Sequence, residues 1–198
     1  MVETPRRQQI EDAASTLFRE RGYAATSVRD IAQALNLQGG SLYAHMASKE
    51  DVLWSIVNRA ADRFNTEVAP LAAATQPPSR LRAMIRAHVS VVTSAQKDAS
   101  VFLDEWRFLS AERRAQIAAR RDAYEALFRN AIADGIQVGV FDAVDVRITA
   151  TAILSALNGI ASWYRAGGPL SADEIADSYA ELFLKALREP HFMTRTIT

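Results

Sequence analysis

The spacing of apolar residues predicts helices along almost the whole chain. Near the N-terminus, apolar residues recur three and four positions apart, the period of one helix face, in a stripe of Ile10, Ala13, Ala14, Leu17 and Phe18. A second, shorter stripe follows Thr26 and consists of Val28, Ile31, Ala32 and Leu35. Ser27 and Asp30 have capping-box spacing at its start, and Asn36 at its end suits a left-handed turn.

Turn-forming residues divide the rest of the chain into further helices. Ser48 and Asp51 open a long helix through about residue 73, and the proline-containing "TQPPS" at 75–79 ends it. We expect further helices at about 79–95, 99–109, 111–134, 143–165 and 172–188. No stretch shows the alternating pattern of a strand. The predicted fold class is therefore all-α.

Composition narrows the class of protein. The 198 residues are 49% hydrophobic, include no cysteine and carry a formal net charge of zero. A chain without cysteine has no disulfides or thiolate metal sites and suits a reducing cytoplasm. Zero net charge argues against bulk attraction to nucleic acid but not against a local site. The longest uncharged run, between Arg147 and Arg165, is shorter than the roughly 20 residues of a membrane span, so we expect a buried helix there.

The N-terminal helices carry a DNA-binding motif. Three short helices, the last two joined by a tight turn, are typical of a helix-turn-helix, whose second helix enters the DNA major groove. The segment "TSVRDIAQALNLQGGSLYAHMASKEDVL" resembles the DNA-binding segment of TetR-type bacterial repressors over about residues 8–55. It departs from the family pattern at Asn36, Gln38, Ala44 and Met46, which bears on base contacts rather than on the fold. The resemblance implies a helix-turn-helix domain at 1–50, a helical ligand-binding and dimerisation domain at 51–190 and a C-terminal tail at 191–198.

Two adjacent glycines, Gly39 and Gly40, leave the outer face of the expected recognition helix nearly bare when Leu42 points inward. The backbone can then approach DNA closely, and Ala44 can meet a thymine methyl group. Gln38 and Arg29 are the candidates for base-edge hydrogen bonds. The remaining candidates for DNA contact, most of them suited to phosphates, are Thr26, Ser27, Ser41, Tyr43, His45 and Lys49.

Simpler interpretations exist for several of these residues. Tyr43 and His45 could be packed polar groups, and Arg29 a solvated charge. Thr26 and Ser27 are helix caps whatever else they do. The glycine pair could form a plain turn, but a phosphate-binding loop is disfavoured because the chain lacks the Gly-x-x-x-x-Gly-Lys pattern and a preceding strand.

The resemblance implies a homodimer, because two recognition helices must meet two half-sites of an operator. In the family, the last two helices of each subunit form a four-helix dimer bundle. The predicted apolar stripe of the last helix comprises Ile175, Tyr179, Leu182, Phe183, Ala186 and Leu187. The helix before it offers small residues for close packing, namely Ala152, Ala156, Gly159 and Ala161.

The middle helices are expected to enclose a small-molecule site. If 99–109 is one helix, Phe102, Trp106 and Leu109 share a face. Asn158, Trp163 and Tyr164 would complete an apolar site with a few polar groups. Ordinary core packing is the alternative for each apolar residue. A basic stretch is either a solvated face or an anchor for an anionic ligand tail, and its arginines are Arg107, Arg113, Arg114, Arg120 and Arg121.

The segments "GSLYAHMASKE", "EWRFLS" and "NGIASWYRAGG" are similar to the branch of the family that senses acyl-CoA thioesters and controls fatty-acid or sterol breakdown. The alternative within the family is a repressor of a multidrug efflux operon. An all-α enzyme or carrier is the alternative outside it. That alternative is disfavoured because His45, His88 and His191 lie far apart and no metal-ligand or Gly-x-Ser-x-Gly motif occurs. We therefore expect operator DNA, a second copy and a hydrophobic effector as partners, with no catalytic residue, cofactor, metal or membrane.

Overall fold

The computed structural model describes residues 5–37, 44, 46–73 and 76–188, and these residues form helices and no strand. The predicted all-α class is confirmed. The elements in chain order are α1 (Pro5–Arg21), α2 (Val28–Ala34), α4 (Lys49–Val68), the 3₁₀ helix η1 (Ala69–Ala73), α5 (Pro77–Ser94), α6 (Gln96–Asp104), the 3₁₀ helix η2 (Trp106–Phe108), α7 (Ala111–Gln137), α8 (Val146–Trp163) and α9 (Ala172–Ala186). None of the helices in the described part of the chain combines the length and apolarity needed to cross a membrane.

The predicted helix starts are present as capping hydrogen bonds. The Ser27 hydroxyl accepts from the Asp30 amide at 3.2 Å, while the Ser27 amide donates to the Asp30 carboxylate at 2.7 Å. Ser171 and Glu174 form the same box at the start of α9. Ser48 caps α4, and Asn36 has the expected positive φ of 52°. The local chemistry of the sequence thus determines where these helices begin.

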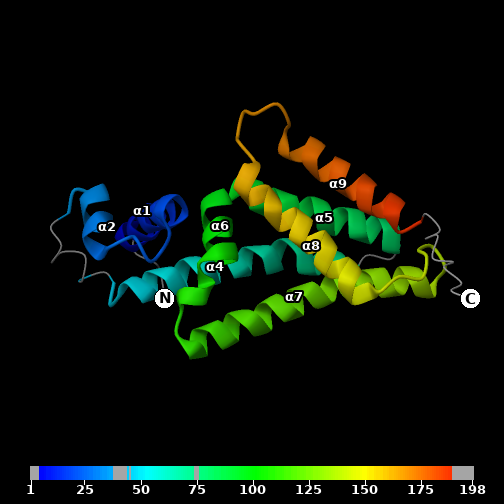
Figure 1. Ribbon diagram of the computed structural model, residues 1–198, viewed down its shortest axis with the longest axis horizontal. Helices are drawn as coiled ribbons and strands as arrows, with labels where there is room; N and C mark the ends of the chain where they lie inside the picture. The colour runs from blue at the N-terminus through cyan, green and yellow to red at the C-terminus, as the bar shows by residue number, and fades with distance from the viewer. Residues whose placement is uncertain (1–4, 38–43, 45, 74–75, 189–198) are drawn as a thin grey trace, which may run out of the picture.

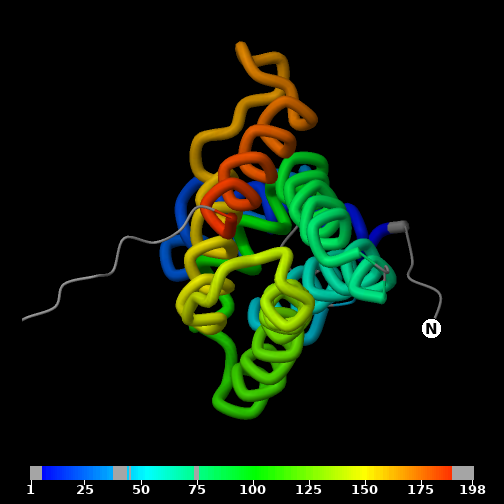
Figure 2. The backbone as a smooth tube through the Cα atoms, turned by 90° about the vertical axis from the view of Figure 1, so that its right-hand side faces the viewer, coloured from blue at the N-terminus to red at the C-terminus, as the bar shows by residue number. Residues whose placement is uncertain are grey.

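Figure 1 shows α1 and α2 at one end of an elongated molecule, with α4 running from that end into the larger helical body. There α4 packs on α5, α6 and α7, and α9 packs mainly on α5. Figure 2 shows α8 and α9 on the side of the molecule away from α4. The end that carries α1 and α2 is therefore connected to the body through α4 and, more locally, through contacts of α1 with α6.

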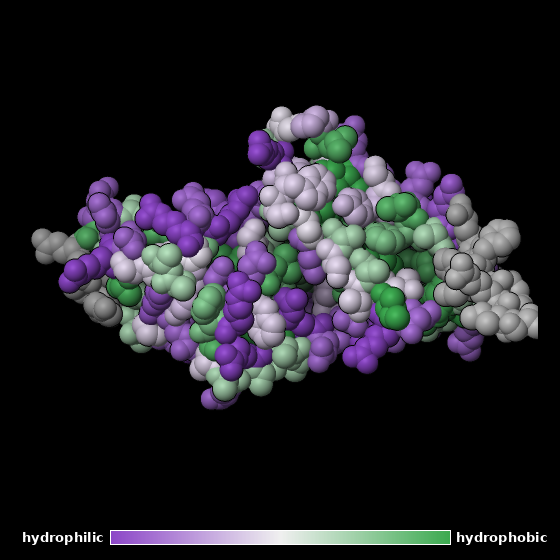
Figure 3. Space-filling model, in the orientation of Figure 1, coloured by the Kyte–Doolittle hydropathy of each residue, from purple (hydrophilic) through white to green (hydrophobic). Residues whose placement is uncertain are grey.

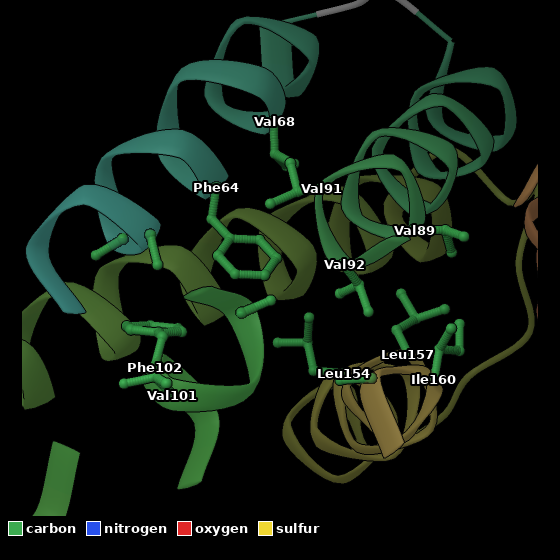
Figure 4. Packing of buried hydrophobic residues seen from close by; sticks show 14 of the residues in the cluster. Phe64, Val68, Val89, Val91, Val92, Val101, Phe102, Leu154, Leu157 and Ile160 are labelled. Carbon is green, nitrogen blue, oxygen red and sulfur yellow. The ribbon is translucent and has the colours of Figure 1, made fainter. Parts of the chain in front are cut away.

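A single hydrophobic core runs from α1 to α9. Figure 4 shows Phe64 of α4 pointing into the space between Phe102 of α6 and Leu154 of α8. The rings of Phe64 and Phe102 lie 5.6 Å apart between centroids. Burial of these large side chains, at about 25 cal/mol per Å² of apolar surface, supplies the main driving force for packing the helices.

The predicted helix over 99–109 is wrong at its C-terminal end. The α6 helix ends at Asp104, the Glu105 amide closes its last turn on the Val101 carbonyl at 2.9 Å, and the chain tightens into η2. A 3₁₀ turn advances a side chain by about 120° rather than 100°. Even so, the rings of Phe102 and Trp106 both lie beside the Arg121 guanidinium of α7, at 5.2 Å and 5.3 Å, so the predicted face forms at these two residues. Leu109 follows η2 and is buried in the core.

Gly135 in α7 is required by a close approach of the Phe141 ring. A Cβ atom on Gly135 would overlap that ring, which is buried, and the Gly135 carbonyl accepts from the Phe141 amide at 3.1 Å. We expect Gly135→Ala to lower the free energy of unfolding by about 1–3 kcal/mol, although alanine is the better helix former. Urea unfolding measures this change. The double variant with Phe141→Leu should recover part of the loss, and an unchanged midpoint in Gly135→Ala would contradict the prediction.

Candidate functional site

Helices α4 to α8 surround a cavity of about 210 Å³. Its apolar wall is built by Ala61, Phe64, Phe102, Leu103 and Leu154. Polar groups lie at two levels: the buried His88 with Tyr124 and Asn158, and the exposed Asn65, Asp122, Thr151 and Ser155. The exposed group places the mouth of the cavity between α4, α7 and α8. Aromatic walls with a few convergent polar groups are the usual construction of a small-molecule site.

His88 forms the polar part of the inner wall. It is 2% exposed, and its Nδ1 lies 2.9 Å from the Tyr124 hydroxyl, whereas its Nε2 is buried without a hydrogen-bond partner in the described structure. Burial lowers the pKa of His88 to about 3, and the Asn158 side chain, which lies near the ring as a weak hydrogen-bond partner, opposes this in smaller part. Asn158 does not reach hydrogen-bonding geometry with Nε2. Burial also raises the pKa of Tyr124. Both side chains are therefore neutral near pH 7.

Arg121 places a cation beside the cavity. Its guanidinium lies 5.2 Å from the Phe102 ring centroid and 5.3 Å from that of Trp106. Its Nη1 is buried and has no hydrogen-bond partner among the described residues. Burial lowers the pKa of Arg121, and the negative charges of Asp104 and Asp122 only partly oppose this. Because a buried N–H without a partner costs free energy, the site is suited to a ligand that supplies an anionic or carbonyl oxygen.

The cavity brings together only part of the predicted ligand site. Phe102 and Asn158 line it. Leu109 is instead buried in the core, and Trp163 is 45% exposed. The Trp106 ring contacts Arg121, with the guanidinium 5.3 Å from the ring centroid. Tyr164 interacts elsewhere, since its carbonyl accepts from the Gln96 side chain at 2.8 Å. The prediction missed His88 and Tyr124, although a histidine within the apolar stretch "AHVSVV" is a detectable signal.

The arginines of the predicted basic stretch have different surroundings: Arg107 and Arg114 are exposed, whereas Arg120 and Arg121 line the cavity. Arg113 lies 2.5 Å from Asp51 and 3.3 Å from Glu50, in the first turn of α4, and its guanidinium lies 5.4 Å from the Trp54 ring centroid. Other members of the stretch also have protein partners: Arg120 pairs with Asp62, and Arg114 donates to the Arg107 carbonyl at 3.3 Å. Arg121 differs from them because its buried nitrogen is unpaired.

The predicted DNA-contact residues fall into three groups. Gln38, Gly39, Gly40, Ser41, Tyr43 and His45 lie outside the described residues. Ser27, Arg29 and Ala44 are exposed. Thr26 and Lys49 make internal bonds: Thr26 is 1% exposed and donates to the Gly22 carbonyl at 2.9 Å, while the Lys49 ammonium donates to the carbonyls of Tyr23 and Thr26 at 2.8 Å. Lys49 thus connects the start of α4 to the loop between α1 and α2.

The buried neutral His88 predicts a pH dependence of stability. The unfolded chain binds a proton near pH 6.5, but the folded protein binds it only near pH 3, so stability is lost as the pH falls from about 6.5 toward 3. Between pH 7.5 and pH 5 we expect this group alone to cost about 2 kcal/mol. The measurement is urea unfolding of the wild type and His88→Phe at both pH values. An identical drop in the two proteins would contradict the prediction.

Two family models match the chain and together cover most of it. The model described as "Bacterial regulatory proteins, tetR family" matches residues 10–56. The model described as "Tetracyclin repressor-like, C-terminal domain" matches residues 74–187. The first match contains the helix-turn-helix segment, and the second contains most of the cavity.

Similar proteins cover nearly the full length. The HTH-type transcriptional repressor KstR2 of Rhodococcus jostii is 30% identical over 94% of this chain and 93% of its own. The structure of the ketosteroid transcriptional regulator KstR2 of Mycobacterium tuberculosis superposes with a TM-score of 0.89 at 28% identity, covering 96% and 97% of the two chains. A structure of AibR in complex with isovaleryl coenzyme A and operator DNA superposes with a TM-score of 0.81 at 31% identity. The match covers 89% of this chain and 97% of the AibR chain.

Proposed function

The chain belongs to the TetR family of bacterial regulatory proteins, and from that premise we propose that an acyl-CoA thioester bound in the cavity of α4 to α8 controls its affinity for operator DNA. The protein is a DNA-binding transcriptional repressor that acts as a dimer, and it is not an enzyme. A repressor must reach its operator DNA, so we propose that the protein is cytoplasmic.

The observation that carries the effector class is the unpaired guanidinium nitrogen of Arg121 beside an aromatic cavity. An acyl thioester has an apolar chain for the aromatic wall, and its carbonyl and phosphate oxygens can accept from Arg121. The AibR complex, a relative with isovaleryl coenzyme A bound, supports the same class. A sensor of hydrophobic cations is less consistent with this cavity, because such a ligand could interact with Asp122 and Glu125 of the lining but would leave the buried Arg121 nitrogen unpaired.

We propose that residues 1–50 form the DNA-binding domain. Within it, we propose that Arg29, Ser27 and Ala44 contact DNA together with the predicted residues of 38–45. The exposed side chains of these three residues support this assignment. Thr26 and Lys49 are left out of the direct contacts because their polar groups are bonded within the protein. Their proposed role is to hold the α1–α2 loop against the start of α4.

The dimer surface is formed by the outer faces of α8 and α9. Figure 3 shows apolar residues gathered over these helices. Ile148 is 68% exposed and Leu182 is 60% exposed, and the small residues Ala152 and Gly159 lie on the exposed side of α8. Ile175 and Leu187, also predicted for this surface, are instead buried in the core of the same chain. The proposed contact with the second subunit therefore uses Leu182, Ala186 and the outer edges of Tyr179 and Phe183.

Two sets of contacts connect the cavity to the DNA-binding end. The α7 helix carries Arg121 into the cavity region, and its N-terminal end is held to α4 by Arg113 and by the Ser110 amide, which donates to Glu50 at 3.0 Å. The α6 helix carries Phe102 in the cavity wall. Its Asp98 accepts from Arg59 of α4 at 3.0 Å and from Ser15 of α1 at 2.7 Å. A ligand that favours another position of α6 or α7 therefore also shifts the orientation of α1 and α4, and by linkage the operator weakens ligand binding by the same factor.

Arg113→Gln tests this connection. We expect the variant to bind operator and thioester individually, but the thioester should change operator affinity about 2- to 30-fold less than in the wild type, because the contact between α7 and the first turn of α4 is lost. Fluorescence anisotropy of an operator duplex with and without octanoyl-CoA measures the factor. The matched control is Arg114→Gln, which changes the neighbouring arginine and should leave the factor unchanged. Equal factors in all three proteins would refute the role of Arg113.

The effector class is tested by calorimetry of the dimer with octanoyl-CoA, octanoic acid and a hydrophobic cation such as tetraphenylphosphonium. We expect the thioester to bind most tightly and to release the operator duplex in the anisotropy assay. Binding of the cation alone would favour the multidrug class, and binding of the free acid without the thioester would overturn the proposal.

A further inference from the structure

The inner wall of the cavity contains a hydrogen-bond donor that the described protein leaves without an acceptor. We propose that the acyl group of the effector carries an oxygen, a ketone or hydroxyl, at the end that enters the cavity first, and that this oxygen accepts from His88 Nε2. The inference rests on the proposed function and specifies the chemistry of the effector. A purely saturated chain would be the poorer ligand.

The Tyr124 hydroxyl determines which ring nitrogen of His88 carries the proton. Its only polar contact among the described residues is His88 Nδ1, at 2.9 Å. If the hydroxyl donates to Nδ1, the proton of the neutral ring is on Nε2, and one buried donor is unpaired. If Nδ1 donates to the hydroxyl, both the hydroxyl hydrogen and the Nε2 lone pair are unpaired. The first arrangement leaves fewer unsatisfied groups, so Nε2 is a donor.

The position of His88 explains why the oxygen belongs at the leading end of the ligand. His88 lies on α5, surrounded by the rings of Phe64, Tyr124 and Phe128, whose centroids are 4.9 Å, 5.9 Å and 6.4 Å away. The exposed residues that line the cavity belong to α4, α7 and α8, and none of them belongs to α5. An acyl chain that enters through the mouth therefore reaches His88 with the end opposite its thioester. Asn158 of α8 lines the same cavity and offers an amide to the same oxygen.

The size of the cavity limits the ligand to a medium-length chain or a small ring. A volume of about 210 Å³ accommodates roughly 14 to 21 non-hydrogen atoms, since each needs roughly the 10–15 Å³ of a single water-sized site. A saturated group of this size would cover Nε2 and exclude water from it, and the donor would remain unpaired. An oxygen at that position restores the hydrogen bond, which corresponds to about tenfold or more in affinity.

The test compares octanoyl-CoA with 7-oxo-octanoyl-CoA by calorimetry on the dimer. In the wild type we expect the oxo thioester to bind at least tenfold more tightly. In His88→Phe, which keeps a ring but removes the donor, the two affinities should become equal or reverse. Ser90→Ala, an exposed position on the same helix, should keep the wild-type ratio. Thermal unfolding checks that each variant is folded. If the His88→Phe protein is not folded, Tyr124→Phe is used instead. It should reduce the ratio of the affinities for the oxo and the saturated thioester several-fold.

Equal affinities of the two thioesters in the wild type would overturn the inference, because another group, such as bound water, would then satisfy Nε2. If neither thioester binds, the proposed effector class is wrong, and small probes decide the inference separately. In that case cyclohexanone and cyclohexane are titrated while the ¹⁵N resonance of His88 Nε2 is followed. A shift with the ketone alone supports the inference, whereas no shift, or equal shifts with both probes, overturns it.

Discussion

Replacing Arg121 with methionine should weaken the binding of an acyl-CoA thioester about 10- to 100-fold, because a charge-assisted hydrogen bond to the ligand is lost. The same substitution should leave the free energy of unfolding unchanged or raise it. The Arg121 nitrogen is buried and unpaired without ligand, so methionine removes a desolvated charge and still packs against the rings of Phe102 and Trp106. Calorimetry and urea unfolding measure the two effects.

The opposite signs of the two effects distinguish a ligand anchor from a structural arginine. A structural arginine would lose stability on substitution, and ligand binding would fall only as a consequence of the damage. Arg114→Met is the matched control on the same helix, because it removes an equal charge at an exposed position. It should change thioester affinity by less than about threefold, as expected for a screened surface charge. A destabilised Arg121→Met protein with normal affinity would refute the assignment.

Leu182→Glu should convert the dimer to a monomer at micromolar concentration and weaken operator binding about 100-fold or more. Leu182 is 60% exposed in the single chain, on the surface that α8 and α9 present to the second subunit. A twofold interface contains the substituted position twice, so dimerisation would bury two carboxylates without partners, each at a cost of several kcal/mol. A monomer also contacts only one half-site of the operator.

Light scattering measures the oligomeric state, and anisotropy with an operator duplex measures binding. Val138→Glu is the matched control, because Val138 is equally exposed, at 62%, but lies at the end of α7. The control should stay dimeric and retain operator affinity. A dimeric Leu182→Glu protein would show that the subunits associate through another surface.

The helical class and most helix boundaries follow from local chemistry. Ser27 with Asp30 and Ser171 with Glu174 form the capping boxes that their spacing predicts, and Asn36 has the left-handed conformation expected of it. These features depend on residues three or four positions apart, so the sequence is sufficient to identify them. The family resemblance likewise depends on a contiguous segment, residues 8–55, and the family match confirms it.

The effector cavity was predictable only in part, because it combines residues from five helices. Phe102 and Asn158 were identified from residue type and position. Trp106 lies beside Arg121 but does not line the cavity, and Leu109 is buried in the core after a 3₁₀ turn that sequence periodicity did not indicate. The sequence marks His88 as a histidine within an apolar stretch, but its role depends on Tyr124, which only the packing of α7 against α5 brings to it.

By itself, the sequence determined that the chain is all-helical and that it has a helix-turn-helix DNA-binding domain. Both features depend on short-range spacing, helix caps and one continuous motif. Only the tertiary structure decided which arginine of the 107–121 stretch is left unpaired beside the cavity, and that His88 meets Tyr124 across the core. Arg113 and Arg120 look the same as Arg121 in the sequence, but carboxylates on α4 neutralise them. Whether a polar group is satisfied depends on partners brought from distant parts of the chain, and that information exists only after the helices have packed.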